Sequence, residues 1–185
     1  YISCNINRGV GYSRNVLLSQ ASGEYLIWLD SDDLMNPDRI KILLKSLIKK
    51  DCDIIYSKIQ WFNKTPGDID KKQFITIDVS KYDKRNWHSL KRNTACASAL
   101  FKQELSKYKF IEDLYLGSED VLWLFQLLQD DVKINYINNP LYYYRRHSNR
   151  IGVKKRSKSM KLLKTKEDIK VSKYIKKIKN VINKS

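Results

Sequence analysis

The pattern of apolar and polar residues predicts alternating helices and strands in the first third of the chain. Residues 12–23 have helical spacing and end in a glycine that can stop a helix. Residues 25–29 form a short, wholly apolar run, as in a buried strand. Residues 36–38 predict a helix start, with asparagine as the cap, proline at the first position and aspartate in the first turn. Its buried face is expected to hold Ile40, Leu43, Leu44, Leu47 and Ile48.

The middle of the chain is patterned more weakly. Residues 52–62 alternate as a long strand. Its inward-facing residues are expected to be Ile54, Tyr56, Ile59 and Trp61. A loop is predicted at 64–72, an edge strand at 73–79, a helix or loop at 82–92 and a strand at 95–102.

The last third predicts a helix, a pair of strands and a basic tail. Residues 119–128 have helical spacing, and the two acids in the first turn suit the helix dipole. Strands are expected at 132–137 and 141–146, joined by an Asn-Asn-Pro turn. A lysine-rich amphipathic helix is predicted at 157–182, with an apolar stripe formed by Val171, Ile175, Ile178 and Ile182. The order of elements predicts an α/β fold in one domain, residues 1–153, followed by a basic tail, residues 154–185.

The distribution of charge weakens a nucleic-acid hypothesis. The formal net charge is +16, but residues 154–185 hold 13 of the 36 basic residues and two of the 20 acidic ones. The body is therefore only mildly basic, and no specific nucleic-acid partner is expected. The tail is expected to pack on its own domain or to lie on an anionic membrane surface.

Other features point to a soluble protein with a real core. The composition is 42% hydrophobic, as in globular proteins. No apolar run approaches the roughly 20 residues of a membrane-spanning helix, and residues 1–8 do not resemble a signal peptide. Three single cysteines show neither metal-ligand spacing nor a disulfide framework. We expect a cytoplasmic location, with possible peripheral contact at the inner face of a membrane.

Three carboxylates, Asp30, Asp32 and Asp33, directly follow the apolar run at 25–29. Ligands bind at the carboxyl ends of strands in open α/β sheets, so these acids are candidates to hold a divalent cation or a polar ligand. Capping of the next helix is the alternative, although it would explain one acid rather than three.

An ordered set of short motifs resembles inverting family 2 glycosyltransferases of the GT-A fold over about residues 5 to 150. The motifs on the donor side are Asn7-Arg8-Gly9, Ser13-Arg14-Asn15, Ala21-Ser22-Gly23-Glu24-Tyr25, the DXD motif Asp30-Ser31-Asp32 with Asp33, and Pro37. Those on the acceptor side are Ser98-Ala99-Leu100-Phe101, Gly117-Ser118-Glu119-Asp120 and Tyr144-Arg145-Arg146-His147. The resemblance implies a mixed sheet with helices on both faces and a transfer of sugar from a nucleotide donor, expected to be a UDP-sugar, to a hydroxyl acceptor.

The resemblance also implies a role for each motif residue. Asp120 is the expected general base, and Glu119 is expected to orient the acceptor or a neighbouring loop, although helix-dipole compensation alone would account for both. Asp32 and His147 are expected to bind Mn²⁺ or Mg²⁺, which offsets charge on the departing diphosphate. The remaining donor-binding residues are expected to be Arg14, Asp30, Ser31, Arg145 and Arg146.

The same resemblance also bears on the nucleotide-base-binding segment and on the binding partners of this chain. Family members begin with a strand and a Pro-x-Tyr-Asn-type segment that hold the nucleotide base, and the printed sequence has no counterpart, so an incomplete donor site is expected. Expected partners are a nucleotide-sugar and a glycan, lipid-linked or protein hydroxyl acceptor, in the synthesis of polysaccharide or glycoconjugate. Two alternatives remain open, which are a basic binding module for nucleic acid or anionic membrane and a non-catalytic transferase-like domain.

Overall fold

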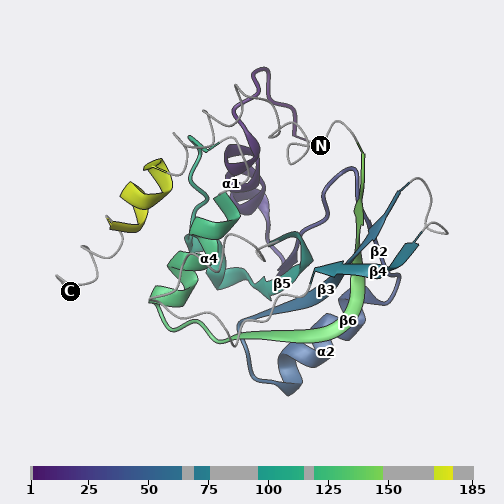
Figure 1. Cartoon of the computed structure of the whole chain (residues 1–185). Helices are drawn as coiled ribbons and strands as arrows, with labels where there is room; N and C mark the ends of the chain where they lie inside the picture. Colours follow the sequence, from purple (N-terminus) through teal and green to yellow (C-terminus); the bar gives the residue numbers. More distant parts are fainter. Residues whose placement is uncertain (1, 64–68, 76–95, 115–118, 148–168, 177–185) are drawn as a thin grey trace.

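The fold is a mixed sheet with helices on both faces, as the sequence predicts (Figure 1). This computed structural model describes residues 2–63, 69–75, 96–114, 119–147 and 169–176. Five strands follow the order β1-β5-β3-β6-β2, and β4 pairs with β3 off this path. The pairing of β3 with β6 is parallel, whereas all the other pairs are antiparallel. The strands are β1 Tyr25–Ile27, β2 Leu34–Met35, β3 Ile54–Phe62, β4 Ile69–Ile75, β5 Ala99–Lys102 and β6 Ile134–Arg145. The described helices are α1 Val10–Gln20, α2 Arg39–Lys49, α4 Glu119–Gln129, an unlabelled helix at 169–176 and the short 3-10 turns η3 Cys96–Ser98 and η4 Gln103–Lys107.

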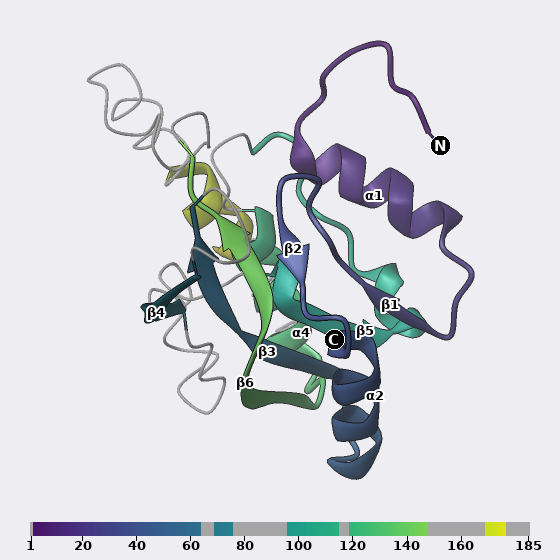
Figure 2. The ribbon, with the colours of Figure 1, turned by 90° about the vertical axis from the view of Figure 1, so that its right-hand side faces the viewer.

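The two faces of the sheet carry separate hydrophobic cores. The larger core joins α1, α4 and a helix at 169–176 to the sheet, and the smaller core lies under α2. Figure 1 shows α2 and the helix at 169–176 on opposite sides of the sheet, and Figure 2 shows α1 and α2 well apart from each other. Because both faces are covered, β3 is buried at nearly every residue, the polar Ser57 and Gln60 included, rather than at alternate residues.

The first helix and strand are confirmed with different limits and burial. The backbone of Gly9, with φ of 88°, lies in the left-handed region that glycine favours, and α1 starts directly after it. Strand β1 was expected to be buried, but it is an edge strand of three half-buried residues. Trp28 is buried beyond its end, whereas Leu29 is exposed.

Helix α2 begins at Arg39, two residues later than predicted, and its buried face is narrower than expected. Asp38 holds the N-cap position without a side-chain cap hydrogen bond, whereas Asn36 accepts a hydrogen bond from the Asp38 amide (2.9 Å) in the turn that precedes the helix. Ile40 and Ile48 are exposed (47% and 63%), so their predicted burial is wrong. The buried face instead holds Arg39, Leu43 and Leu47, which are spaced four residues apart.

The middle of the chain is only partly as predicted. Strand β4 begins at Ile69, inside the expected loop, and ends at Ile75. The expected strand at 95–102 consists of η3 followed by β5. The predictions for residues 82–92 and for the end of the edge strand lie outside the described residues.

Strand β6 is one element, whereas the sequence predicted two strands and a turn. Between Ser57 and Ile59, β3 advances two residues while β6 advances five, from Ile137 to Tyr142. Pro140 lies where this pairing is irregular, so its missing amide hydrogen does not interrupt a regular ladder of hydrogen bonds. The bend of β6 is visible in Figure 1. The strand therefore continues past the proline to the candidate site.

Helix α4 confirms its prediction, and part of the predicted tail helix packs on the domain. Val171 and Ile175 are buried in the larger core. Lys170 and Tyr174 both hydrogen-bond the Asp113 carboxylate, at 3.2 and 3.1 Å. Ile178 and Ile182 lie outside the described residues. None of the helices in the described part of the chain is long and apolar enough to cross a membrane.

Candidate active site

The turn that follows β1 separates its acids by exposure. A hydrogen bond from the Asp33 amide to the Asp30 carbonyl oxygen (3.1 Å) closes the turn. Ser31 and Asp32 are exposed and Asp30 is half-buried, but only 6% of Asp33 is exposed. The turn thus presents the three DXD residues to solvent and directs Asp33 into the protein.

Asp33 anchors the turn to β6. Its carboxylate accepts hydrogen bonds from the Tyr142 hydroxyl (2.5 Å) and from the Arg145 amide (2.8 Å). Burial raises the pKa of Asp33 to about 6, although these two hydrogen bonds oppose that rise. The Tyr142 hydroxyl also accepts a hydrogen bond from the Asp30 amide (3.4 Å). Asp33 therefore has a structural role in holding the turn against β6.

The exposed side of the same turn meets the end of β6. The Asp32 carboxylate lies 2.8 Å from Nε2 of His147, and Arg145 Nε donates a hydrogen bond to the Asp32 carbonyl oxygen (2.7 Å). About half of the Asp32 side chain and a third of the His147 side chain are exposed. Two residues that are more than 100 positions apart thus meet where a ligand can reach them.

The two arginines of this strand end lie over aromatic rings. The Arg145 guanidinium carbon is 4.6 Å from the centroid of Phe62, and that of Arg146 is 4.3 Å from the centroid of Trp61. Such stacking fixes the direction of a guanidinium group and leaves its edge able to donate hydrogen bonds. Of these two arginines, Arg145 lies against the DXD turn.

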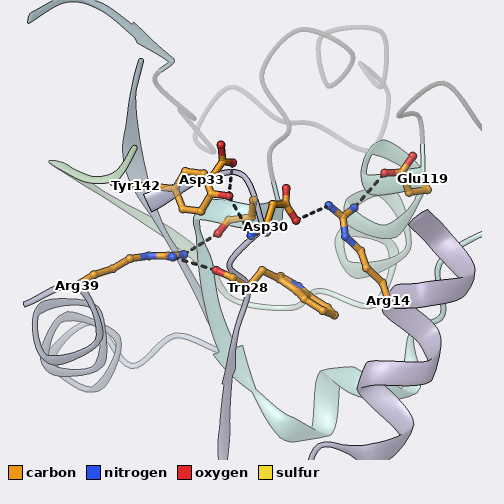
Figure 3. Close-up of polar contacts among 8 residues, drawn as sticks. Arg14, Trp28, Asp30, Asp33, Arg39, Glu119 and Tyr142 are labelled. Atoms are coloured by element: carbon orange, nitrogen blue, oxygen red, sulfur yellow. Dashed lines mark hydrogen bonds and ion pairs between the residues drawn. The ribbon is translucent and has the colours of Figure 1, made fainter. Parts of the chain in front are cut away.

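Arg14 connects the DXD turn at residues 30–33 (the donor turn) to the start of α4 (Figure 3). It donates a hydrogen bond to Glu119 (3.0 Å), and its other terminal nitrogen lies 3.7 Å from the Asp30 carboxylate. Burial by itself would lower the pKa of Arg14, but nearby acidic groups, including Glu119 and Asp30, raise it above its ordinary value. Arg14 remains a buried cation between two carboxylates.

The two acidic residues at the start of α4 differ in how deeply they are buried. Glu119 is 3% exposed and is paired with Arg14, whereas Asp120 is half-buried. The Asp120 carboxylate accepts a hydrogen bond from the Val121 amide (2.8 Å), and its charge acts on Arg14. Asp120 is therefore the more accessible acid, and Glu119 can affect a ligand only through its neighbours.

Arg39 is a further residue of this region that the sequence interpretation missed. It is fully buried, and it donates hydrogen bonds to the carbonyl oxygens of Trp28 (2.9 Å) and Ala97 (2.6 Å), as Figure 3 shows for the side near Trp28. Burial lowers its pKa to about 10. Its spacing of four from Leu43 was a usable signal, because it places a charged residue in the buried row of α2.

Asp32 and His147 can hold a metal ion only together with a bound ligand that supplies further coordinating atoms. Among the described residues, no group of three or more His, Cys, Asp or Glu side chains could hold a metal ion. Asp32 and His147 offer one carboxylate and one imidazole, which suit a site that takes its other ligands from phosphate and water.

Comparisons with known proteins identify the family of this chain. The family model for glycosyl transferase family 2 matches residues 1–108. Glycosyltransferase GlyG of Streptococcus pneumoniae is 27% identical over 154 residues, which cover 77% of this chain and 50% of GlyG. Poly(ribitol-phosphate) beta-N-acetylglucosaminyltransferase TarS of Staphylococcus aureus is 26% identical over 136 residues, which cover 74% of this chain and 23% of TarS.

A solved structure supports the same fold. The crystal structure of S. aureus TarS 1–349 in complex with UDP-GlcNAc superposes with a TM-score of 0.59 at 20% identity, covering 77% of this chain and 40% of that one. This chain spans half or less of the length of these relatives. Because the family model matches more than half of the chain and the fold agrees, the chain has a GT-A fold and belongs to glycosyl transferase family 2.

Proposed function

We propose that the protein carrying this chain transfers a sugar from a UDP-sugar to a hydroxyl acceptor, with inversion at the anomeric carbon and with the help of a divalent metal. The observation that carries the proposal is the position of Arg14 between Asp30 and Glu119. It brings the DXD turn and the start of α4, about 90 residues apart in sequence, to the same place. A donor motif and a candidate base are thereby neighbours.

The donor end of the proposed site is the DXD turn with the end of β6. Asp32 and His147 would hold Mn²⁺ or Mg²⁺, which supplies positive charge to offset the charge that develops on the diphosphate. Asp30 and Ser31 would face the ribose or diphosphate, and the edge of the Arg145 guanidinium would donate to phosphate oxygens. Arg146 would contribute positive charge from its position over Trp61.

The chemistry at the other end needs one base. The acceptor oxygen attacks the anomeric carbon from the face opposite the diphosphate, and its proton passes to the Asp120 carboxylate. The new carbon–oxygen bond forms while the bond to the diphosphate oxygen breaks, and its electron pair leaves with UDP. A single displacement of this kind inverts the anomeric centre.

The names of the relatives suggest which substrates to try first. TarS is named as a poly(ribitol-phosphate) beta-N-acetylglucosaminyltransferase and was crystallised with UDP-GlcNAc. We therefore choose UDP-GlcNAc as the first donor and poly(ribitol phosphate) as the first acceptor. The net charge of +16 would attract such a polyanion over a long range.

The test is titration calorimetry of the full-length protein with UDP, with Mn²⁺ and with EDTA, together with an assay for UDP release from UDP-sugars. Asp32→Ala is expected to weaken Mn²⁺-dependent UDP binding by at least about tenfold, because the carboxylate ligand is lost. Asp120→Asn is expected to reduce turnover by about 100-fold or more while UDP binding is retained. Glu104→Gln removes an exposed carboxylate of η4 and serves as the matched control.

Four results would count against the proposal. A full-length protein that binds no UDP would favour a non-catalytic transferase-like domain. Normal turnover in Asp120→Asn would remove the base assignment, and UDP binding that is equal in Mn²⁺ and EDTA would remove the metal. Salt-sensitive polyanion binding without UDP binding would instead favour the basic binding module.

A further inference from the structure

One face of α1 is directed at residues 110–112 and at Glu119, the first residue of α4. Gly11 and Asn15 lie against residues 110–112, and Arg14 binds Glu119. A Cβ atom built on Gly11 would lie only 2.6 Å from the carbonyl oxygen of Ile111, so only glycine allows this approach. Helix α1 therefore packs directly against the backbone that precedes the candidate base.

Asn15 fixes this segment by hydrogen bonds in both directions. Its side-chain amide donates to the Phe110 carbonyl oxygen (2.9 Å) and to the Glu112 carboxylate (3.0 Å). Its side-chain oxygen accepts from the Phe110 amide (2.8 Å). The amide group of Asn15 thus pairs with the backbone of Phe110 as a neighbouring strand would.

Arg14, on the same face of α1, reaches the carboxylates of Glu119 and Asp30. One terminal nitrogen is taken by Glu119, the other faces Asp30, and only 9% of the side chain is exposed. Its guanidinium carbon lies 5.3 Å from the ring centroid of Phe110 and 5.8 Å from that of Trp28, so apolar rings flank it. Little of this guanidinium group remains available to a phosphate.

We propose that Arg14 and Asn15 are positioning residues that hold the base-bearing start of α4 at a fixed distance from the donor turn, Arg14 by bridging Asp30 and Glu119. This inference rests on the proposed function. It assigns to Arg14 an action on the donor through Asp30 rather than a direct contact with the diphosphate. It also gives the buried Glu119 a purpose, which is to receive Arg14 and so orient the adjoining Asp120.

Five variants of the full-length protein, Asn15→Ala among them, separate positioning from folding and from donor contact. Arg14→Met alone leaves Glu119 buried without its cation and is expected to destabilise the fold. The double variant Arg14→Met/Glu119→Gln removes both charges, so its stability is expected to recover while its turnover stays low. Arg14→Lys keeps the charge but cannot donate to two carboxylates as a planar fork does. Lys133→Met is the control, because Lys133 pairs with Asp51 at the surface, away from the motif residues, and 62% of its side chain is exposed.

The readouts are UDP affinity by calorimetry, and kcat and KM for UDP release from UDP-GlcNAc. We expect kcat to fall about 100-fold in the double variant, because misplaced reacting groups cost about that much. We expect UDP affinity to fall by much less than the roughly 10- to 100-fold that loss of a direct guanidinium–diphosphate bond would cause. Arg14→Lys is expected to show the same split in smaller measure, and Asn15→Ala to lower kcat with UDP affinity retained.

Two outcomes would overturn this inference. A normal kcat in either folded Arg14 variant would show that the bridge positions nothing. A large loss of UDP affinity with a normal kcat would make Arg14 a direct donor ligand. Failure of the proposed function itself would appear separately, because the unaltered protein would then neither bind UDP nor release it from the donor.

Discussion

The guanidinium carbon of Arg39 lies 4.8 Å from the ring centroid of Tyr142, so a buried arginine of α2 packs on a buried tyrosine of β6. The two residues hold opposite sides of the donor turn. Arg39 binds the carbonyl oxygen of Trp28 just before the turn, and the Tyr142 hydroxyl binds Asp33 at its end. The position of the DXD motif therefore depends on residues that cannot themselves reach the donor.

Replacement of Arg39 by methionine is expected to lower the free energy of unfolding by about 3 kcal/mol, because two buried carbonyl oxygens lose a charged donor. UDP affinity is expected to fall as well, since the Trp28 anchor is lost. Urea unfolding and calorimetry measure the two effects. Lys45→Met, at an exposed position of the same helix, is the control and is expected to change neither. Equal stability of the two variants would contradict the anchoring role.

Asp33 is expected to make the fold less stable as the pH rises from about 4 to about 6. Its pKa is raised from 3.8 to about 6 in the folded chain, so in this window the folded state keeps a proton that the unfolded state has released. The stabilising contribution is complete below the lower value and is lost above the upper one, a total of about 3 kcal/mol. Urea unfolding of cation-free protein across this range measures it. In Asp33→Asn this component is expected to be absent, and parallel pH profiles for the two proteins would refute it.

Gly11→Ala is expected to destabilise the protein by about 1 to 3 kcal/mol, because the new methyl group would overlap the Ile111 backbone. The sign is informative, since alanine is otherwise favoured over glycine in a helix by about 1 kcal/mol. Thermal unfolding compared with Gln20→Ala, an exposed position of α1, measures the difference. A stabilised Gly11→Ala would mean that α1 can move away from residues 111–112 at little cost.

Ile175→Ala is expected to cost about 2 to 4 kcal/mol, because Ile175 is 4% exposed in the larger core. Ile169→Ala removes the same atoms from a side chain that is 53% exposed, so it is expected to cost much less. The difference in urea midpoints measures how firmly the helix at 169–176 packs. Similar midpoints for the two variants would show that this helix contributes little to the core.

These contacts also affect how the function of the tail can be tested. Deletion of residues 154–185 would remove Val171 and Ile175 from the core together with the positive charge. Loss of polyanion binding after such a deletion would therefore not be specific to charge. Replacement of the exposed Lys173 and Lys176 by glutamine keeps the core and changes the charge alone.

The sequence was sufficient for the elements that local pattern determines. Helix α4 and strand β3 lie close to where the local pattern places them, although α2 starts two residues later than the Asn36-Pro37 signal predicts. The order of the motifs was sufficient for the fold class. Burial was predicted less well, because the exposure of Ile40 and Ile48 depends on which face of α2 meets the sheet.

The candidate site shows the same limit. Sequence order could place Asp32 and His147 among the metal candidates, but only the pairing of β2 with β6 brings them to 2.8 Å. The contact of Arg14 with Glu119 spans 105 positions, so no local pattern reports it. The sequence interpretation divides β6 into two strands because proline normally ends a strand. Here an irregularity in the pairing with β3 accommodates Pro140 within one strand.

That irregularity determines where the chain can gain or lose residues. Tyr142 lies only two residues past Pro140, and the side chains of a strand alternate between its faces. Loss of one residue from 138–140 would turn Tyr142 away from Asp33 and direct Tyr143 there instead. Loss of two would keep the facing but draw the strand end, with Arg145 and His147, back by about 7 Å. We therefore expect homologous chains to vary in length in their surface loops and to keep this short stretch at constant length.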